Sequence, residues 1–375
     1  MSFWQNLSIR RNVIKAFKCG ELYLRNYDKP ILPKIKRVVH KSNYTEVVFS
    51  IPTGLSPKEF EKKDFVFNQI FGDKIELDIN NKYCRLLIRT NNDLSNVYGY
   101  EVIKQQLKGK RLGVVAGMDL NGKYYSYCMT KMPHLLIAGE TGSGKSTQLR
   151  QILTTFIMSY PSNKLKLYLA DCKRSEFHIF RNVDHVQCVH TNARDIKMML
   201  KEIQKELYHR SELTEQFEVA NIDDLPVTHK KPYLVVCIDE FVMLRDEKEI
   251  MEILVEIVAI GRTLGVFAIL SMQRPSAKII DSTVRANLTV AMGFQLRDLV
   301  EERIVNTPGA SKLKEAGQLI LNTDDNYSLQ APFLDLEIAK ELLKSFKVVK
   351  KKVENVKEVE KIKELTESDV FNNAN

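Results

Sequence analysis

KMPHLLIAGETGSGKSTQ, residues 131–148, decides the fold of this chain. An apolar run, LLIAG, leads into a glycine-rich stretch, and QLRQILTTFIM follows with the spacing of a helix. The stretch satisfies the pattern GxxxxGK[ST] at Gly139, Gly144, Lys145 and Ser146. A strand, a glycine-rich loop and a helix in this order predict a phosphate-binding loop.

Each residue type in this pattern has a mechanical reason. Glycines let the backbone wrap around a phosphate without a Cβ clash, and the loop amides and the helix N-terminus then point at the anion. The ammonium of Lys145 can reach the β- and γ-phosphates, and the hydroxyl of Ser146 can bind Mg²⁺. The stretch therefore predicts a site for ATP and Mg²⁺.

The second part of this site is predicted at YLVVCIDEF, residues 233–241. Its apolar run brings Asp239 and Glu240 to the carboxyl end of a buried strand, where ligands bind in α/β proteins. We expect Asp239 to hold Mg²⁺ together with Ser146, and Glu240 to polarise the attacking water. The residues expected to bind the nucleotide are Gly139, Glu140, Thr141, Gly142, Ser143, Gly144, Lys145, Ser146, Thr147 and Asp239.

A third segment, AILSMQRP at residues 268–275, ends another apolar run with polar residues. We expect Gln273 to contact the γ-phosphate or the water as a sensor of hydrolysis. An ordinary passage from strand to loop is the alternative.

Short apolar runs recur at KLYLAD, YLVVCID, VFAILS and LTVAMGF, and helical patterns separate most of them. This alternation predicts an α/β fold with a mainly parallel sheet that helices cover on both faces. QLIL, near residue 318, is a candidate for the last strand.

Four regions are predicted along the chain. Residues 1–34 form a helical or irregular lead-in, which we expect to pack on the protein rather than on a membrane. Residues 35–110 have the pattern of a small α+β domain with a connector at 91–110. Residues 111–345 form the α/β ATPase domain. Residues 346–375 form a charged, partly disordered tail, with a short amphipathic helix as the alternative.

The composition narrows the class of protein. The formal net charge of +9 favours a polyanionic partner such as nucleic acid, or an anionic membrane surface. No two of the six cysteines have CxxC spacing, so zinc is not expected, and their scatter without a signal peptide predicts a cytoplasmic protein. The longest apolar runs, such as VFAILSM, fall well short of the roughly 18 residues that a membrane span needs.

These segments together resemble the FtsK/SpoIIIE DNA translocases, a branch of the RecA-like P-loop ATPases that includes HerA. KMPHLLIAGETGSGKS is similar to the Walker A segment of that family, and YLVVCIDEF to its Walker B segment. GRTLGVFAILSMQRPSAKIIDSTVRANLTVAMGFQLRD and GASKLKEAGQLIL resemble later family segments, so the resemblance spans residues 110–325. It implies a RecA-like fold and a hexameric ring that pumps duplex DNA at the expense of ATP.

The resemblance also implies roles for single residues. Gly144, Lys145, Ser146 and Thr147 match nucleotide-binding positions of the family. Asp239 and Glu240 match its Mg²⁺ and hydrolysis positions, and Gln273 matches its sensor. LADCKRSEF, residues 169–177, matches the family pattern at Asp171, Lys173 and Glu176, but Cys172 replaces a proline. For Lys173 and Glu176 a mutual ion pair remains as open as a functional role.

A ring motor also needs cations at two places. One arginine should reach the γ-phosphate from the neighbouring subunit, because negative charge develops there in the transition state. The candidates are Arg262, Arg274 and Arg303, of which we favour Arg262 and Arg303. DNA should be held through its phosphates without sequence preference. The candidates for that contact are Lys278, Arg285 and Arg297.

Two departures from the family narrow the prediction. The sequence before the ATPase domain has no membrane-spanning run, and the residues after 345 are too few for the winged-helix module of chromosome-segregation members. The chain is therefore most similar to the coupling ATPases of conjugative elements. That resemblance implies relaxase and secretion-channel partners, and recruitment to the inner face of the cell membrane through a partner.

The sequence alone leaves three alternative functions open. The first is a motor that partitions or packages plasmid or phage DNA. The second is an ATP-gated scaffold of a secretion complex that does not hydrolyse ATP. The third is a protein-secretion ATPase of the related EssC type, which DNA would not stimulate.

Overall fold

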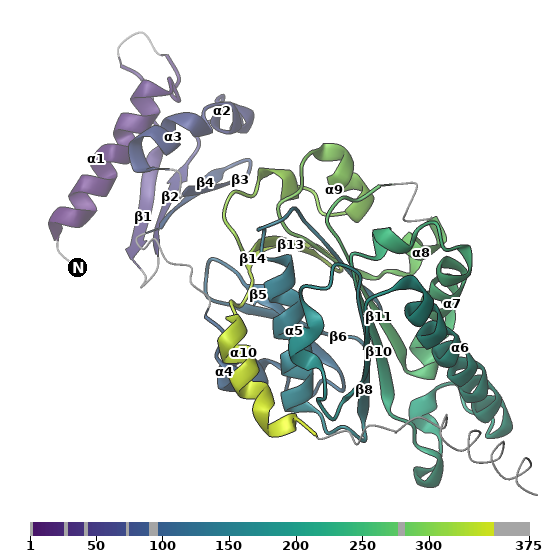
Figure 1. The fold of residues 1–375 in the computed structure, drawn as a ribbon. Coiled ribbons are helices and arrows are strands. Elements are labelled where there is room, and N and C mark those ends of the chain that lie inside the picture. Colours follow the sequence, from purple (N-terminus) through teal and green to yellow (C-terminus); the bar gives the residue numbers. More distant parts are fainter. Residues whose placement is uncertain are drawn as a thin grey trace, which may run out of the picture. The chain divides into compact units, whose positions relative to one another are not determined.

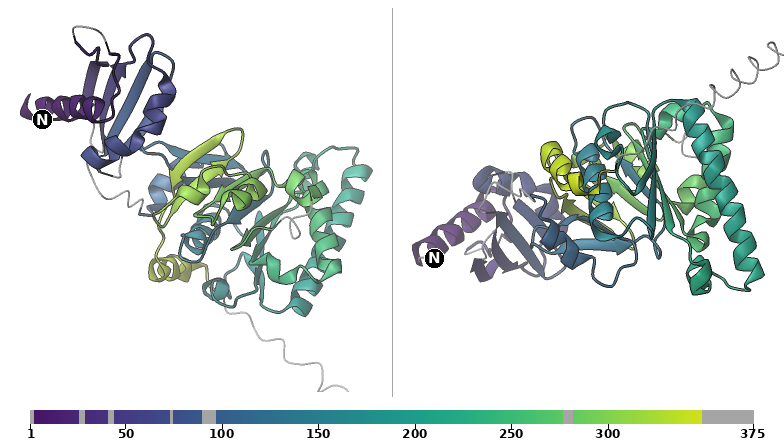
Figure 2. Two further views of the ribbon diagram at one scale, coloured as in Figure 1. Left: turned by 90° about the horizontal axis from the view of Figure 1, so that it is seen from above. Right: turned by 60° about the horizontal axis from the view of Figure 1, so that its bottom comes forward.

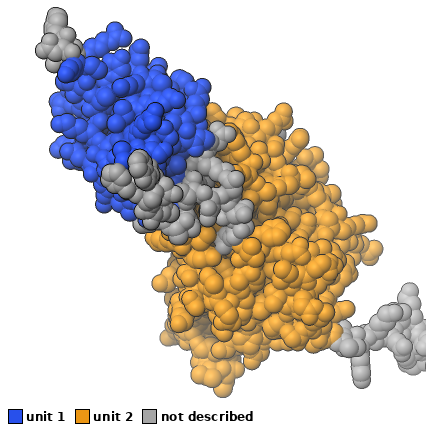
Figure 3. Space-filling model, turned by 90° about the vertical axis from the view of Figure 1, so that its left-hand side faces the viewer, with its two compact units in different colours: residues 1–95 blue, residues 96–375 orange. Residues whose placement is uncertain are grey.

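The structure, a computed structural model, describes residues 3–25, 29–40, 44–72, 75–89, 97–276 and 282–348. The chain divides into two compact units, Met1–Ser95 and Asn96–Asn375, which Figure 3 shows in two colours. Lys278 and residues 349–375 of the predicted tail lie outside the described residues.

The small unit is built on an antiparallel sheet. Among its described residues the strands number four, in the order β1-β2-β4-β3. The strands are β1 (Lys34–His40), β2 (Tyr44–Ser50), β3 (Ile75–Ile79) and β4 (Tyr83–Arg89). The helices are α1 (Phe3–Cys19), α2 (Pro57–Lys62) and α3 (Asp64–Phe71).

Helix α1 packs into the core of this unit. The ring of Phe17 lies 4.8 Å from that of Phe49 on β2 and 6.2 Å from that of Phe67 on α3, centroid to centroid. Val13 and Ala16, on the same face of α1, are fully buried. The apolar face of the first helix is therefore covered by the sheet and by α3.

The large unit contains a mixed sheet. Its described residues form ten strands in the order β6-β5-β14-β13-β12-β7-β11-β10-β8-β9. The six from β12 to β9 are mutually parallel, and the other four pair in an antiparallel manner. The strands are β5 (Gly113–Met118), β6 (Tyr124–Cys128), β7 (Leu135–Ala138), β8 (Leu165–Asp171), β9 (Val186–His190), β10 (Tyr233–Asp239), β11 (Val266–Met272), β12 (Val290–Gly293), β13 (Gln318–Asn322) and β14 (Asn326–Gln330). The predicted α/β fold is confirmed, with an antiparallel edge in addition.

Helices cover both faces of this sheet, as Figures 1 and 2 show. On one face lie α4 (Tyr100–Gln106), α5 (Lys145–Ser159) and α10 (Leu336–Leu343). On the other lie α6 (Ala193–Gln216) and α7 (Lys248–Leu264). Every residue of β11 is buried, because helices pack on both of its sides. The remaining helices are α8 (Ser282–Asn287) and α9 (Leu299–Val305), with short 3-10 helices at Phe177–Phe180, Ile222–Asp224, Val227–His229, Phe241–Leu244, Ala310–Lys312 and Lys344–Phe346.

Helix α4 lies in the stretch that the sequence predicts to be a connector. Ile103 and Leu107 of this stretch belong to the core between the sheet and α5. Tyr98 donates its hydroxyl proton to, or accepts one from, Thr155 on α5, with 3.0 Å between the oxygens. Residues 97–107 are therefore part of the packed large unit.

The parallel register sets the position of the site. Ala138, the last residue of β7, lies beside Met272 at the end of β11. Asp239, the last residue of β10, lies beside Asp171 at the end of β8. The four loops that follow these strands leave the sheet at the same edge, where α/β folds bind their ligands.

None of the helices in the described part of the chain combines the length and the apolar character needed to cross a membrane.

His134 gives the fold a titratable group that must stay neutral. It is completely buried, and its Nδ1 accepts the backbone N–H of Ala268 at 3.0 Å. Burial lowers the pKa of His134 to about 4, whereas an unfolded chain has a histidine pKa of about 6.5. The unfolded state therefore binds a proton more readily between these values. Stability is fully present above about pH 6.5 and falls by about 3 kcal/mol as the pH falls to 4.

The variant His134→Asn should lose this part of the pH dependence. Asparagine does not titrate, and it tolerates the positive φ of 60° at this position. Urea unfolding followed by far-UV circular dichroism at pH 7 and pH 4.5 measures the difference. Parallel stability curves for the variant and its parent would show that His134 is not the group that titrates.

Candidate active site

The loop between β7 and α5 has the conformation that its glycines permit. Gly142 and Gly144 have φ angles of 83° and 108°, in the region that side chains other than glycine rarely adopt. A Cβ atom on Gly144 would also lie only 2.8 Å from the backbone nitrogen of Gly317. The loop therefore needs glycine at both positions.

Neighbouring segments hold this loop through its backbone. Gly317 donates its N–H to the carbonyl of Ser143 at 2.8 Å, and Glu140 donates its N–H to the carbonyl of Gln295 at 2.9 Å. Within the loop, the hydroxyl of Ser143 donates to the carbonyl of Glu140 at 2.7 Å. Because the bonds from Gly317 and to Gln295 use backbone atoms only, the sequence gives little sign of them. Sequence reasoning misses the role of Gly317, although its segment, GASKLKEAGQLIL, carries part of the family resemblance.

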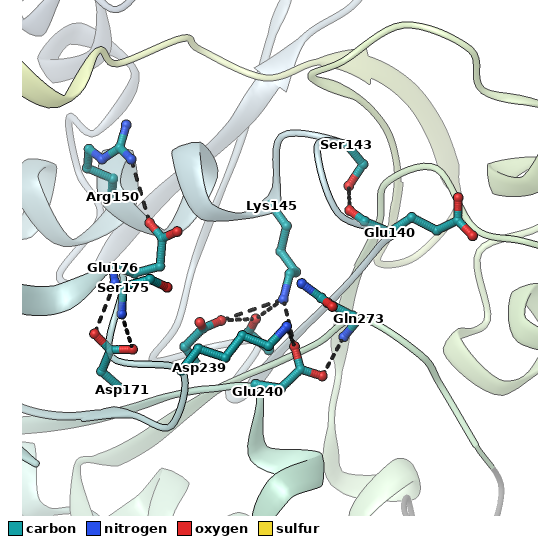
Figure 4. Close-up of polar contacts among 12 residues, drawn as sticks. Glu140, Ser143, Lys145, Arg150, Asp171, Ser175, Glu176, Asp239, Glu240 and Gln273 are labelled. Carbon is teal, nitrogen blue, oxygen red and sulfur yellow. Dashed lines mark hydrogen bonds and ion pairs between the residues drawn. The ribbon is translucent and has the colours of Figure 1, made fainter. Parts of the chain in front are cut away.

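Lys145, the first residue of α5, points from the loop into a buried cluster of acids, as Figure 4 shows. Its side chain is 5% exposed, and its Nζ donates to the hydroxyl of Ser271 at 3.0 Å. The same Nζ lies 3.6 Å from Oδ1 of Asp239 and 3.5 Å from Oε2 of Glu240. Ser271 in turn donates to Oδ1 of Asp239 at 2.7 Å. The buried ammonium is thus compensated by two carboxylates, as a buried charge requires.

Glu240 is held on both of its carboxylate oxygens. Its Oε1 accepts the backbone N–H of Gln273 at 3.0 Å, and its Oε2 lies 3.0 Å from Nζ of Lys173. The backbone of Glu240 has φ 54° and ψ 52°, a left-handed conformation that costs a non-glycine residue about 1 kcal/mol or more. This strained position turns the side chain toward Lys145 and Gln273.

Gln273 contacts the acid through its backbone. Its N–H binds Glu240, and the residue also lines the pocket beside the phosphate-binding loop. The predicted sensor position is therefore adjacent to the predicted base.

The turn after β8 is built on Asp171. Its carboxylate accepts the backbone N–H groups of Ser175, Glu176 and Phe177 at 3.0 to 3.1 Å. The cysteine that replaces the family's proline is therefore accommodated in an ordered turn.

The mutual ion pair considered for Lys173 and Glu176 is absent among the described residues. Lys173 instead pairs with Glu240, and Nη2 of Arg150 lies 3.6 Å from Oε2 of Glu176. The pair does not form because the turn directs the two side chains toward partners on different elements. Lys173 thereby belongs to the acidic cluster.

A pocket of about 600 Å³ opens beside the loop. This volume lies within the range of sites for small molecules. One part of its lining is polar and comes from Glu140–Gly142, Gly144–Thr147, Lys173, Asp239 and Gln273. Another part is the segment Gln330–Phe333, where the large aromatic side chain of Phe333 is 54% exposed. The pocket therefore offers both an anion-binding loop and an apolar surface.

The donor set in this pocket suits Mg²⁺. The Ser146 hydroxyl and the Asp239 carboxylate both line it, and hard oxygen ligands of this kind are those that Mg²⁺ prefers. Within the described residues no three His, Cys, Asp or Glu side chains gather as a metal site. Magnesium needs no such cage, because it usually shares its coordination with substrate phosphates and water.

The candidate arginines lie outside the pocket lining. Arg262 is in the last turn of α7, directly before β11, so it lies at the sheet edge opposite the loop. Arg303 is exposed on α9, and Arg274 is exposed next to Gln273. Of the described candidates for DNA contact, Arg285 on α8 and Arg297 after β12 are both exposed.

The phosphate-binding loop lies in a segment that matches a known protein family. The model of the FtsK/SpoIIIE family matches residues 99–228. This segment is therefore similar to the FtsK/SpoIIIE family. Asp239 and Glu240 follow shortly after its end.

Related sequences are named as DNA translocases. The DNA translocase FtsK of Tropheryma whipplei is 33% identical over 218 residues, which are 54% of this chain and 29% of that protein. The DNA translocase FtsK of Helicobacter pylori strain J99 is 28% identical over 276 residues, which are 69% of this chain and 33% of that protein. The chain thus spans about a third of the length of these relatives.

Solved structures share the fold of this chain. The pCW3 conjugation coupling protein TcpA, in a monomer form with ATPγS, superposes with a TM-score of 0.62 at 20% identity, covering 88% of this chain and 97% of that chain. The cytoplasmic domain of the Type VII secretion ATPase EccC from Thermomonospora curvata gives 0.59 at 23% identity, covering 69% of this chain and 34% of that chain. At these identities the likeness establishes the fold.

Proposed function

We propose that this chain is an ATP-driven DNA translocase of the FtsK/SpoIIIE type that couples ATP hydrolysis to DNA movement in conjugative transfer. The observation that carries the proposal is the buried cluster of Lys145, Ser271, Asp239 and Glu240 at the phosphate-binding loop. A P-loop lysine beside paired acids at the end of another strand is the arrangement of enzymes that hydrolyse nucleoside triphosphates.

Binding of ATP would rearrange the charges of this cluster. The loop amides and the start of α5 would hold the phosphates, and Lys145 would exchange its carboxylate partners for phosphate oxygens. Ser146 and Asp239 would hold Mg²⁺, which supplies positive charge at the phosphates. Asp239 is already held at the pocket by Ser271, so this carboxylate needs little reorganisation.

Glu240 is the residue that we assign to the water. Lys173 and the backbone N–H of Gln273 fix its carboxylate, so it can orient and deprotonate a water at the γ-phosphate. We assign the sensing of the loss of that phosphate to the side chain of Gln273, which also lines the pocket.

Phe333 is the residue that we assign to the nucleobase. An exposed aromatic ring in the lining of a phosphate-binding pocket offers a stacking surface, and such stacking contributes about 1–3 kcal/mol per base.

Phe333→Ala should therefore raise the KM for ATP by about 10-fold and change kcat by less than about 2-fold. The backbone bond from Tyr98 N–H to the Phe333 carbonyl is kept in this variant. Phe333→Tyr should retain the parent KM, and an unchanged KM in the alanine variant would contradict the assignment.

The cation that acts on the γ-phosphate from outside would come from a neighbouring subunit. Among the described residues that line the pocket there is no arginine, which supports a ring with an arginine in trans. We assign this role to Arg262 or Arg303, both of which are exposed and free to face a neighbour. A hexamer is the assembly proposed.

The conjugative role rests on likeness of fold over nearly the whole chain. A conjugation coupling protein matches 88% of the chain in fold, and the related sequences are DNA translocases. The proposed partners are DNA, a relaxase and a secretion channel, and the chain would reach a membrane through one of them.

The ATPase rate with added duplex and single-stranded DNA, measured across a salt series, tests this proposal. We expect DNA to stimulate hydrolysis and the stimulation to weaken as salt rises, since phosphate contacts release counterions. The fold is shared with a Type VII secretion ATPase, so a secretion role is the second candidate. ATP turnover that DNA leaves unchanged at every salt concentration would contradict the proposal and favour that candidate.

A further inference from the structure

The positive charge of the chain is concentrated in the small unit. Residues 1–95 contain 17 lysines and arginines against ten aspartates and glutamates, a net charge of +7 out of the chain's +9. Residues 96–375, which include the proposed ATPase site, are therefore almost neutral. A protein that holds a polyanion needs its cations where the polyanion lies.

Helix α1 is the most basic element of this unit. Its sequence, FWQNLSIRRNVIKAFKC, has four basic residues and no acidic one. Arg11, Lys15 and Lys18 follow one another at helical spacing, so they lie on one face of α1. All three are exposed, and none forms an ion pair with another described residue.

This basic face points away from the core. Val13, Ala16 and Phe17, on the opposite side of α1, are completely buried against the sheet and α3. The unit therefore presents three unpaired cations over about 10 Å of helix, a distance along which one DNA strand presents about three phosphates.

We infer that Arg11, Lys15 and Lys18 on α1 form a contact site for the phosphate backbone of DNA. This site on the small unit would contact DNA in addition to the contacts expected on the ATPase unit. The inference rests on the proposed function. The alternative polyanion is a lipid surface. A helix that binds a bilayer inserts its apolar face. Val13, Ala16 and Phe17 of α1 are buried in their own unit, whereas Leu7 and Ile14 are exposed beside the basic residues. Too little apolar surface is therefore exposed on α1 for insertion to be the favoured mode, and the vesicle measurement below tests it.

The test compares two triple variants of the full chain. One changes Arg11, Lys15 and Lys18 to glutamine. The matched control changes Lys58, Lys62 and Lys63 to glutamine, which removes the same charge from a segment that also holds Glu59, Glu61 and Asp64. Anisotropy of a fluorescein-labelled duplex of random sequence gives the affinity at several salt concentrations. ATP turnover without DNA and the thermal midpoint should match the parent in both variants.

We expect the α1 variant to bind DNA at least about 10-fold more weakly than the parent, with a log–log salt slope shallower by about 3. The control should bind within about 3-fold of the parent. If the parent binds DNA and the α1 variant binds as well as the control does, the α1 site is wrong and the proposed translocase stands. If the parent itself does not bind DNA, the proposed function fails first.

Vesicles provide the lipid arm of the test. The parent should bind phosphatidylcholine vesicles with phosphatidylserine no better than vesicles without it. Binding to the phosphatidylserine vesicles that the α1 variant loses, together with unchanged DNA binding, would assign this face to a membrane and overturn the inference.

Discussion

Lys145→Ala should lower ATP turnover by at least about 100-fold. The lysine is the only protein cation that approaches both Asp239 and Glu240 among the described contacts, and it starts the helix that follows the phosphate-binding loop. Its loss removes the charge that meets the β- and γ-phosphates. Steady-state hydrolysis, with binding of a fluorescent ATP analogue measured in parallel, gives the size of the effect.

The same substitution leaves two buried carboxylates without their shared cation. Folding must therefore be checked, because an uncompensated buried charge destabilises a protein by several kcal/mol. Lys173→Ala is a useful comparison, since Lys173 also approaches Glu240 but is 33% exposed. Turnover by Lys145→Ala within about 2-fold of the parent would contradict the assignment of the loop.

Glu240→Gln should lower kcat by about 100- to 10,000-fold while ATP still binds. Glutamine has the shape of glutamate and keeps an oxygen that can accept the N–H of Gln273, but it cannot take a proton from water. The variant should therefore trap the nucleotide in the pocket. Turnover and the amount of bound analogue should be measured on the same preparation.

Glu247→Gln is the matched control for this second prediction. It makes the same chemical change on a half-buried side chain outside the pocket, whose contact with Lys197 is a long 3.9 Å. Its turnover should equal that of the parent. Equal turnover in Glu240→Gln, with ATP binding retained, would contradict the assignment of Glu240 as the base. A parent protein that binds ATP without measurable turnover would instead support the scaffold alternative.

The sequence predicts those parts of the fold that have a characteristic residue pattern within one continuous segment. The phosphate-binding loop is one continuous segment, and the acids at 239 and 240 directly follow their apolar run, so both could be located without knowing the fold. The parallel strands β7, β8, β10, β11 and β12 coincide with short apolar runs, because each is largely buried between helices.

The antiparallel edge could not be predicted in the same way. Strand β6 has the sequence YYSYC and lies half-buried, so it lacks the apolar run of a central strand. Strand β14 follows β13 in a hairpin, and its sequence, NYSLQ, gives little strand signal. Pairing with neighbours, which only the fold supplies, decides both elements.

Contacts between distant segments account for the rest of the site. The partners of Lys145 come from the ends of two other strands, and Gly317 reaches the loop from a segment far along the chain. Phe333 joins the pocket through the chain that follows β14. None of these contacts follows from residue spacing, because each depends on the order of strands in the sheet.

The central claim is that ATP hydrolysis at this site drives movement along DNA. Displacement of a third strand from duplex DNA tests this claim most directly, since it reports movement along DNA rather than binding. The parent protein with ATP should displace a labelled triplex-forming oligonucleotide, and Glu240→Gln with ATP should leave it in place. A parent protein that hydrolyses ATP in the presence of DNA and still leaves the third strand bound would contradict the claim that this site drives DNA movement.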